Sequence, residues 1–171
     1  CLFLKGPALA YQLYKNLSMR TSNDLDVLIS LKDFKKADAL LIERGYERDE
    51  YKRSVLGDWK WKNHHVEYMH PDTLQKIELH WKLHPGGAKE PNFDQLWNRK
   101  QASTLTKKPT YLLGTEDLYV FLLIHGARHG WFRLRWLVDL ADLSKQITDW
   151  RLIKKMKHSY QVSHIADQVG L

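Results

Sequence analysis

The stretch of sequence that decides the fold is Asn23-Asp24-Leu25-Asp26-Val27-Leu28-Ile29-Ser30. Its apolar run predicts a buried strand, and two carboxylates one residue apart open that strand. Because side chains alternate faces along a strand, Asp24 and Asp26 project from one face, about 7 Å apart along the chain. The pattern therefore predicts two acidic side chains held close together at the start of a strand.

Such a pair of aspartates suits a divalent cation. Two close carboxylates raise each other's pKa unless a cation lies between them. Mg²⁺ fits this role because it takes oxygen ligands, keeps several waters and bridges to substrate phosphates. The simpler interpretation is an aspartate pair that caps a strand end at a turn, and the two residues alone favour it. The sequence on either side changes that balance.

A phosphate-binding turn is predicted upstream of the aspartates. The run Leu2-Phe3-Leu4-Lys5-Gly6-Pro7-Ala8-Leu9 indicates a short apolar strand, a glycine turn and a helix with proline at its first position. Gly6 lets the backbone approach a ligand closely, and the free N–H groups at the start of a helix favour an anion. Arg20, between the turn and the aspartates, adds a fixed positive charge suited to phosphate.

A third carboxylate is predicted downstream. The run Gln75-Lys76-Ile77-Glu78-Leu79-His80-Trp81 alternates polar and apolar residues, which is typical of a strand. We expect Glu78 to join the aspartates from a neighbouring strand. His80 shares the face of Glu78, since it follows two residues later. It either orients that carboxylate or contacts substrate, or it is a packed imidazole, and the pattern favours the two interpretations equally.

In combination, these motifs resemble the nucleotidyltransferase superfamily that includes DNA polymerase beta. The closer resemblance is to the bacterial family of uncharacterised nucleotidyltransferases, and it extends over nearly the whole chain in the expected order. The motifs that carry it are Lys5-Gly6, Arg20, Asp24-Leu25-Asp26, Gly45-Tyr46, Glu78-Leu79-His80-Trp81 and the helical signature His125-Gly126-Ala127-Arg128-His129-Gly130-Trp131, followed by Leu134, Trp136 and Asp139.

The resemblance implies an α+β fold, with a nucleotidyltransferase-like mixed sheet, flanking helices and then a C-terminal helical unit. It also implies transfer of a nucleoside monophosphate from a nucleoside triphosphate to an acceptor hydroxyl on a small molecule, sugar, protein or RNA. The implied roles are catalysis and binding of Mg²⁺ or Mn²⁺ for Asp24, Asp26 and Glu78, nucleotide binding for Lys5, Gly6 and Arg20, and candidate substrate contacts for His80 and His129.

The glycine turn departs from the pattern of the wider superfamily. That superfamily usually has Gly-Ser or Gly-Gly there, with the serine hydroxyl holding nucleotide phosphates. Here Gly6 is followed by Pro7 and Ala8, so the hydroxyl is missing and one N–H donor is lost. The alternative function is therefore a non-catalytic nucleotide- or nucleic-acid-binding regulatory protein on the same fold.

Nine histidines raise the hypothesis of a zinc site. His125 and His129 are four residues apart and would share a helix face, but zinc needs a third and usually a fourth ligand. Packing in the helical unit is the favoured role. A weaker alternative is that Arg128, His129 and Arg133 face the active site. We expect the adjacent pair His64-His65 to be exposed at a turn or strand.

Composition limits the class of protein. The 171 residues carry a net charge of +7, from 27 Lys and Arg against 20 Asp and Glu, with one cysteine. The single cysteine excludes an internal disulfide and fits a reducing cytoplasm. No apolar run approaches the ~20 residues needed to cross a bilayer, so no membrane partner is expected. The positive charge is spread along the chain, which makes a nucleotide a better anionic partner than nucleic acid.

The remaining pattern predicts the order of elements. We expect an amphipathic helix over 32–44, a hairpin that joins the segment 59–68 to 75–81, and a short helix over 93–100. From Thr115 onward the pattern is helical, with helices from 115, over 134–147, after Thr148-Asp149 and after Ser163. This gives a catalytic unit at 1–110 and a helical unit at 111–171. Since the chain begins at Cys1 inside a predicted strand, we expect it to be part of a longer protein.

Overall fold

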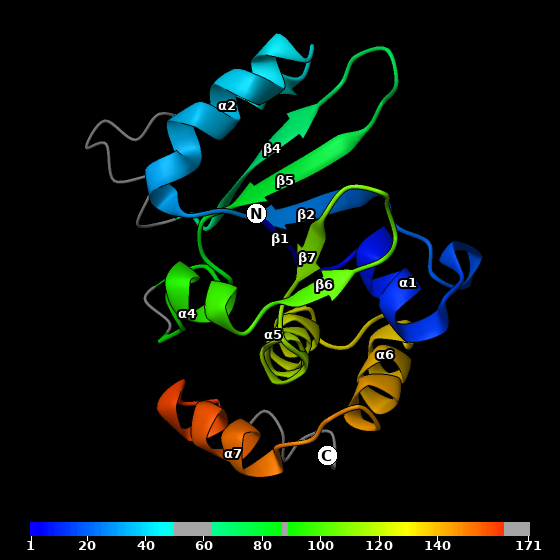
Figure 1. The fold of residues 1–171 in the computed structure, drawn as a ribbon, viewed down its shortest axis with the longest axis vertical. Helices are drawn as coiled ribbons and strands as arrows, with labels where there is room; N and C mark the ends of the chain where they lie inside the picture. The colour runs from blue at the N-terminus through cyan, green and yellow to red at the C-terminus, as the bar shows by residue number, and fades with distance from the viewer. Residues whose placement is uncertain (50–62, 87–88, 163–171) are drawn as a thin grey trace.

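A mixed β-sheet organises the part of the chain that the computed structural model describes, which is residues 1–49, 63–86 and 89–162. In these residues the sheet has seven strands (Figure 1). Their spatial order is β3 (Glu47–Arg48), β4 (His65–Met69), β5 (Lys76–His80), β2 (Asp24–Leu28), β1 (Leu2–Phe3), β7 (Thr110–Leu112) and β6 (Gln101–Ser103).

Helices flank the sheet and then continue to the end of the described chain. They are α1 (Pro7–Tyr14), α2 (Phe34–Glu43), α4 (Phe93–Asn98), α5 (Thr115–Arg128), α6 (Arg135–Ser144) and α7 (Trp150–Ser159), with short 3₁₀ turns at Leu17–Met19 and Leu31–Asp33. Figure 1 shows α2 beside the β4–β5 hairpin and α7 at the opposite end of the molecule. The predicted α+β class is confirmed. The boundary near residue 110 stays a prediction.

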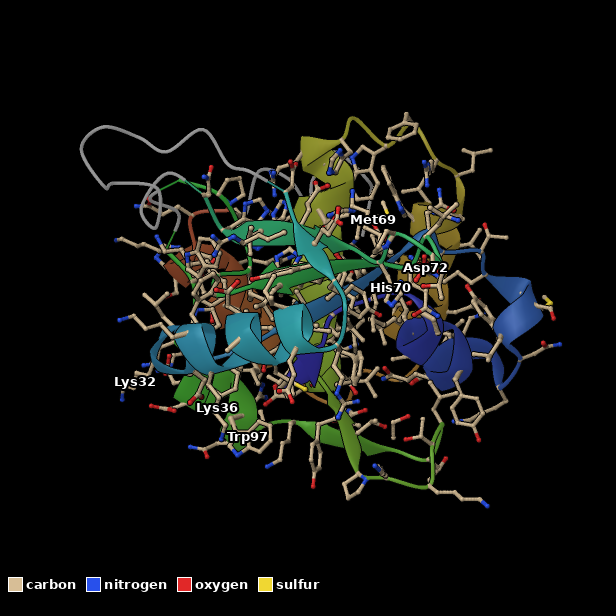
Figure 2. The ribbon with its side chains drawn as sticks, turned by 90° about the horizontal axis from the view of Figure 1, so that it is seen from above. Lys32, Lys36, Met69, His70, Asp72 and Trp97 are labelled. Atoms are coloured by element: carbon tan, nitrogen blue, oxygen red, sulfur yellow. The ribbon has the colours of Figure 1, made fainter. Side chains whose placement is uncertain are left out.

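Strand β2 lies at the centre of the sheet and has a different pairing on each side. It runs antiparallel to β1 and parallel to β5, with Asp26 opposite Glu78. Strands β4 and β5 form the predicted antiparallel hairpin. His70 and Asp72 lie at its turn (Figure 2). The residues 59–62 that were also assigned to this hairpin lie outside the described residues.

The two faces of the sheet bury different clusters. Alternate residues of β4 and β5, including Val66, Tyr68 and Leu79, pack with Phe34 on the α2 face. The other side of α2 is exposed, and Lys36 projects outward from it, as does Lys32 from the preceding 3₁₀ turn (Figure 2). The larger cluster gathers β1, α1, α5, α6 and α7, and it consists mainly of leucines, among them Leu2, Leu9, Leu28, Leu113, Leu118, Leu123, Leu140 and Leu143.

Most of the predicted helices and strands are present, but they are shorter than predicted. The helix predicted over 32–44 is α2, and Gly45 ends it with φ at +83°. Asp149 caps α7, because its Oδ1 accepts a hydrogen bond from the Leu152 N–H at 2.9 Å. Strands β6 and β7 were missed, and residues 104–109 connect them. Ser163 lies outside the described residues. None of the described helices is long and apolar enough to cross a membrane.

Candidate active site

A row of three carboxylates crosses one face of the sheet. Asp26 on β2 is opposite Glu78 on β5, which is opposite Glu67 on β4. Residues opposite one another on neighbouring strands have Cβ atoms about 4.5–5.5 Å apart, and like charges there destabilise the sheet. Asp24, two residues before Asp26, adds a fourth carboxylate on the same face. This acidic row costs stability unless cations offset it.

Three cations lie among these carboxylates. The Lys5 Nζ is 2.7 Å from Asp26 Oδ1 and 3.7 Å from Asp24 Oδ2. The His80 Nε2 lies between Asp26 Oδ1 at 3.3 Å and Glu78 Oε2 at 3.4 Å. On the outer side, the Lys76 Nζ is 2.6 Å from Glu67 Oε2. Each cation therefore bridges or borders carboxylates that would otherwise repel.

The contacts between His80 and the carboxylates shift two pKa values in opposite directions. Burial alone would raise the pKa of Glu78, but the hydrogen bond from His80 and the charge of Lys5 hold it below its ordinary value. Burial alone would lower the pKa of His80, but the bonds to Asp26 and Glu78 raise it. Both side chains are therefore favoured in their charged forms, as expected for an ion pair.

One carboxylate oxygen of Asp26 makes no hydrogen bond to any described residue. Its side chain is fully buried, at 0% exposure, and its Oδ2 has no hydrogen-bond partner among the described residues. A buried carboxylate oxygen without a partner is costly, so the arrangement suits a ligand that is positively charged. Asp26, Glu78 and His80 offer ligand atoms that all lie within 4.8 Å of one another. These residues fit a divalent metal ion.

The predicted glycine turn lies directly behind the aspartates. Gly6 has φ at +73°, and a Cβ atom there would lie 3.2 Å from the Asp24 carbonyl oxygen and 3.3 Å from Ser22 Oγ. Glycine is needed for this close approach. Gly6 is not among the residues that line the cavity described below, whereas Lys5 and Ser22 are. The Ser22 hydroxyl, which sequence reasoning missed, donates to the Asp24 carbonyl at 2.7 Å.

Arg20 is fixed by a buried ion pair. Its side chain is 4% exposed, and its Nε is 3.0 Å from Asp139 Oδ2 on α6. The Tyr14 hydroxyl donates to the other Asp139 oxygen at 2.8 Å, and burial together with this bond raises the pKa of Tyr14. A guanidinium has five N–H donors, and the bond to Asp139 uses the one on Nε. Arg20 also lines the cavity.

The end of α5 and the start of α6 form the opposite wall. The turn between them depends on Gly126, where a Cβ atom would lie 2.1 Å from the Trp131 ring. Trp131 itself has φ at +55°, and its N–H donates to the Gly126 carbonyl at 3.0 Å. Side chains from this region that line the cavity are His125, Arg128, His129, Phe132, Arg133, Arg135 and Trp136.

The two walls enclose a cavity of about 320 Å³ that is lined by charges of both signs. The carboxylates come from the sheet, whereas the arginines are Arg20 and those of α5, α6 and the connection between these two helices. A cavity of this size is at the lower end of the range for small-molecule sites, about 300–1,000 Å³. The arrangement suits a ligand that carries both phosphate groups and a bound cation.

The structure brings most of the predicted site residues together. Asp24, Asp26, Glu78, Lys5, Arg20, His80 and His129 all line this cavity, and Gly6 lies behind it. His64 and His65, which we expected to be exposed, are half-buried and also line the cavity. The hairpin explains this difference, because its register puts His65 opposite His80. Burial and neighbouring histidines lower the pKa of His64 to about 2.

This mixed sheet with its acidic row is the architecture expected of a nucleotidyltransferase. The chain belongs to the family described as uncharacterised nucleotidyltransferases, whose model matches residues 1–170. No curated protein matches the chain. Among solved structures, it is similar to the lincosamide antibiotic adenylyltransferase LnuA with lincomycin bound, with a TM-score of 0.48 and 16% identity over 73% of this chain and 74% of that chain.

Proposed function

We propose that this chain transfers a nucleoside monophosphate from a nucleoside triphosphate to a hydroxyl group of an acceptor. The observation that carries the proposal is the alignment of Asp26 and Glu78 on parallel strands, with Asp24 beside them and one Asp26 oxygen without a partner. Membership of a nucleotidyltransferase family supports the same class of reaction.

In this proposal Asp24, Asp26 and Glu78 hold Mg²⁺ or Mn²⁺. Bound metal ions supply charge stabilisation for the attacking and leaving oxygens of an in-line displacement. Glu78 is better suited to binding metal than to acting as a general base, because its lowered pKa makes it a weak proton acceptor. Asp24 is only partly buried, so it is accessible from the cavity.

The basic side chains would hold the triphosphate. Lys5 lies beside the aspartates, and Arg20 and Arg128 line the cavity around them. An arginine fork matches the geometry of phosphate oxygens, so these residues would orient the chain of phosphates. In the reaction the acceptor oxygen bonds to the α-phosphorus, the bond from that phosphorus to the bridging oxygen breaks, and pyrophosphate leaves. The hydroxyl proton passes to solvent or a nearby base.

The nucleobase and the acceptor would lie toward the helical wall. Phe132 is 66% exposed and lines the cavity beside Arg133, whose guanidinium lies 5.1 Å from the Phe132 ring centroid. An exposed ring of this kind provides a stacking surface for a base. His129 and His80 remain proposed substrate contacts, since both line the same cavity.

Labelled nucleotides test the proposed transfer directly. The purified chain is incubated with Mg²⁺, cell extract and each of labelled ATP, CTP, GTP and UTP, and the species that gains label is identified. We expect one class of acceptor to be labelled with release of pyrophosphate. Asp26→Asn should abolish labelling, whereas Asp94→Asn, which changes an exposed aspartate on α4, should preserve it. Equal labelling by both variants would contradict the proposal.

A non-catalytic nucleotide-binding protein is the second candidate. The observation that favours it is the Lys5 ammonium, which already lies between Asp24 and Asp26, together with the missing hydroxyl at the turn. Thermal melting with Mg²⁺ and each nucleotide separates the candidates when it is combined with the labelling experiment. A ligand at 100 times its dissociation constant should stabilise the chain by about 2.7 kcal/mol. Stabilisation without labelling would favour the non-catalytic protein.

A further inference from the structure

Three histidines form a cluster at the edge of the acidic row. His65 begins β4 and His64 directly precedes it, while His80 ends β5 opposite His65. Their ring centroids are 4.3 Å apart for His64 and His65, 4.8 Å for His65 and His80, and 5.4 Å for His64 and His80. One ring nitrogen from each lies within 4.8 Å of one from each of the others.

The spacing of two of these nitrogens is that of ligands on a shared metal ion. The His64 Nε2 and the His65 Nδ1 are 3.1 Å apart. Two nitrogens bound to a tetrahedral zinc at about 2.0–2.1 Å each are separated by about 3.3 Å. The competing interpretation is a hydrogen bond between two neutral imidazoles. Such a bond uses one nitrogen of each ring and does not involve the third histidine, whose Nε2 contacts Asp26 and Glu78 and whose other ring nitrogen is left over.

His80 supports a ligand role through an atom with no partner. Its side chain is 5% exposed, and its Nδ1 has no hydrogen-bond partner among the described residues. Glu67 and Glu78 flank the cluster, and the His65 Nε2 is 3.8 Å from Glu67 Oε1. A second group of ligand atoms, from His65, Glu67 and Glu78, also lies within 4.8 Å. The Glu67 carboxylate thus borders the cluster on the Nε2 side of His65, whereas the Nδ1 of His65 faces His64.

We propose that His64, His65 and His80 form a second metal site, beside the carboxylates, that binds Zn²⁺ or another divalent ion of the first transition series. Imidazole nitrogens suit zinc, cobalt and nickel, whereas carboxylates and water suit magnesium. The two neighbouring sites thus differ in the metal they select. His80 belongs to both groups of ligand atoms, so occupation of the histidine site also changes what surrounds Asp26 and Glu78.

The proposed histidine site does not depend on the proposed nucleotidyl transfer. The metal-binding experiment that tests it therefore contains no nucleotide. Cobalt is the probe, since its visible absorption reports coordination by nitrogen. The purified chain is titrated with Co²⁺ in the presence of excess Mg²⁺, and Zn²⁺ is then added as a competitor. We expect Co²⁺ to bind despite the magnesium and to be displaced by Zn²⁺. Failure of Co²⁺ to bind while excess Mg²⁺ is present would instead assign the binding to the carboxylates and overturn the proposal.

Variants assign the site to its histidines. Loss of a partner that merely orients a metal ligand costs about 10–100-fold in affinity, so His64→Gln and His65→Gln should each weaken Co²⁺ binding by at least about 10-fold. His158 is an exposed histidine on α7 that does not line the cavity, so His158→Gln is the control. This variant should bind Co²⁺ with the affinity of the unaltered chain. Unchanged binding by His64→Gln and His65→Gln would identify the cluster as a hydrogen-bonded pair and overturn the proposal.

If the variants fail to fold, a measurement on the unaltered chain still tests the metal site. The ring ¹⁵N resonances of histidine shift when a nitrogen binds metal. One equivalent of Zn²⁺ in excess Mg²⁺ should shift the resonances of His64, His65 and His80 and leave those of His158 in place. If these three sets of resonances do not move, the cluster is not a metal site.

Discussion

The buried ion pair between Arg20 and Asp139 gives a prediction whose size can be worked out from the structure. Arg20 precedes the acidic strand, whereas Asp139 lies on α6, so the pair joins the sheet side of the cavity to its helical side. Both side chains are buried, with 4% and 2% exposure. Asp139→Asn preserves the shape of the side chain and removes its charge.

The substitution should cost about 3–5 kcal/mol in the free energy of unfolding, which is the usual penalty when one partner of a buried ion pair is removed. An asparagine oxygen can still accept the hydrogen bond from the Tyr14 hydroxyl, which is 2.8 Å from Asp139 Oδ1. The guanidinium of Arg20 would then be buried without its counter-charge. Tyr14→Phe removes only the hydroxyl bond and should cost less, about 1–2 kcal/mol.

Urea unfolding, followed by circular dichroism, measures these differences. The matched control is Asp142→Asn on the same helix. Its partner Lys145 is 74% exposed, and the Lys145 Nζ is 2.6 Å from Asp142 Oδ1. An exposed ion pair contributes only about 0–1 kcal/mol. If Asp139→Asn and Asp142→Asn lower the stability equally, the reasoning about the buried pair is wrong.

Three further predictions concern other parts of the chain. Burial raises the pKa of Glu90 from 4.5 to about 7, so the folded state favours the protonated carboxyl. The stability that this protonated side chain contributes is fully present below pH 4.5 and is lost as the pH rises through 7. The unaltered chain should thus lose about 1–3 kcal/mol across this window relative to Glu90→Gln, and parallel urea-unfolding profiles of the two proteins would contradict this. Gly126→Ala should cost about 1–3 kcal/mol, because the new methyl group overlaps the Trp131 ring, and an unchanged melting temperature would refute the overlap. Phe132→Ala should raise the nucleotide KM roughly 5- to 150-fold with little change in kcat, since stacking contributes about 1–3 kcal/mol per base, and an unchanged KM would exclude stacking.

The sequence predicted the acidic part of the site because strand geometry is local. Alternation along a strand puts Asp24 and Asp26 on one face wherever the strand lies, and it does the same for Glu78 and His80. The turn at Gly6 is equally local, since it depends on a glycine that is followed by a proline at the start of a helix. These features can therefore be predicted without knowing which strands pair.

The rest of the site depends on register and on contacts between distant elements. His65 and Glu67 alternate on β4, but only their pairing with β5 puts them beside His80 and Glu78. The pairing of the hairpin was predicted without its register, so His64 and His65 were misjudged as exposed. The partner of Arg20 is Asp139, 119 residues later, and no local pattern connects the two. Strands β6 and β7 have three residues each, too few to show a period.

Binding of Mn²⁺ to the free protein tests the central claim most directly. Electron paramagnetic resonance measures free Mn²⁺ as the ion is titrated into the unaltered chain, Asp26→Asn, Glu78→Gln and the surface control Asp94→Asn. The unaltered chain and Asp94→Asn should bind the ion alike, whereas Asp26→Asn and Glu78→Gln should each lose at least about 10-fold in affinity. Equal affinity in all four proteins would show that the carboxylates on β2 and β5 do not hold a metal ion.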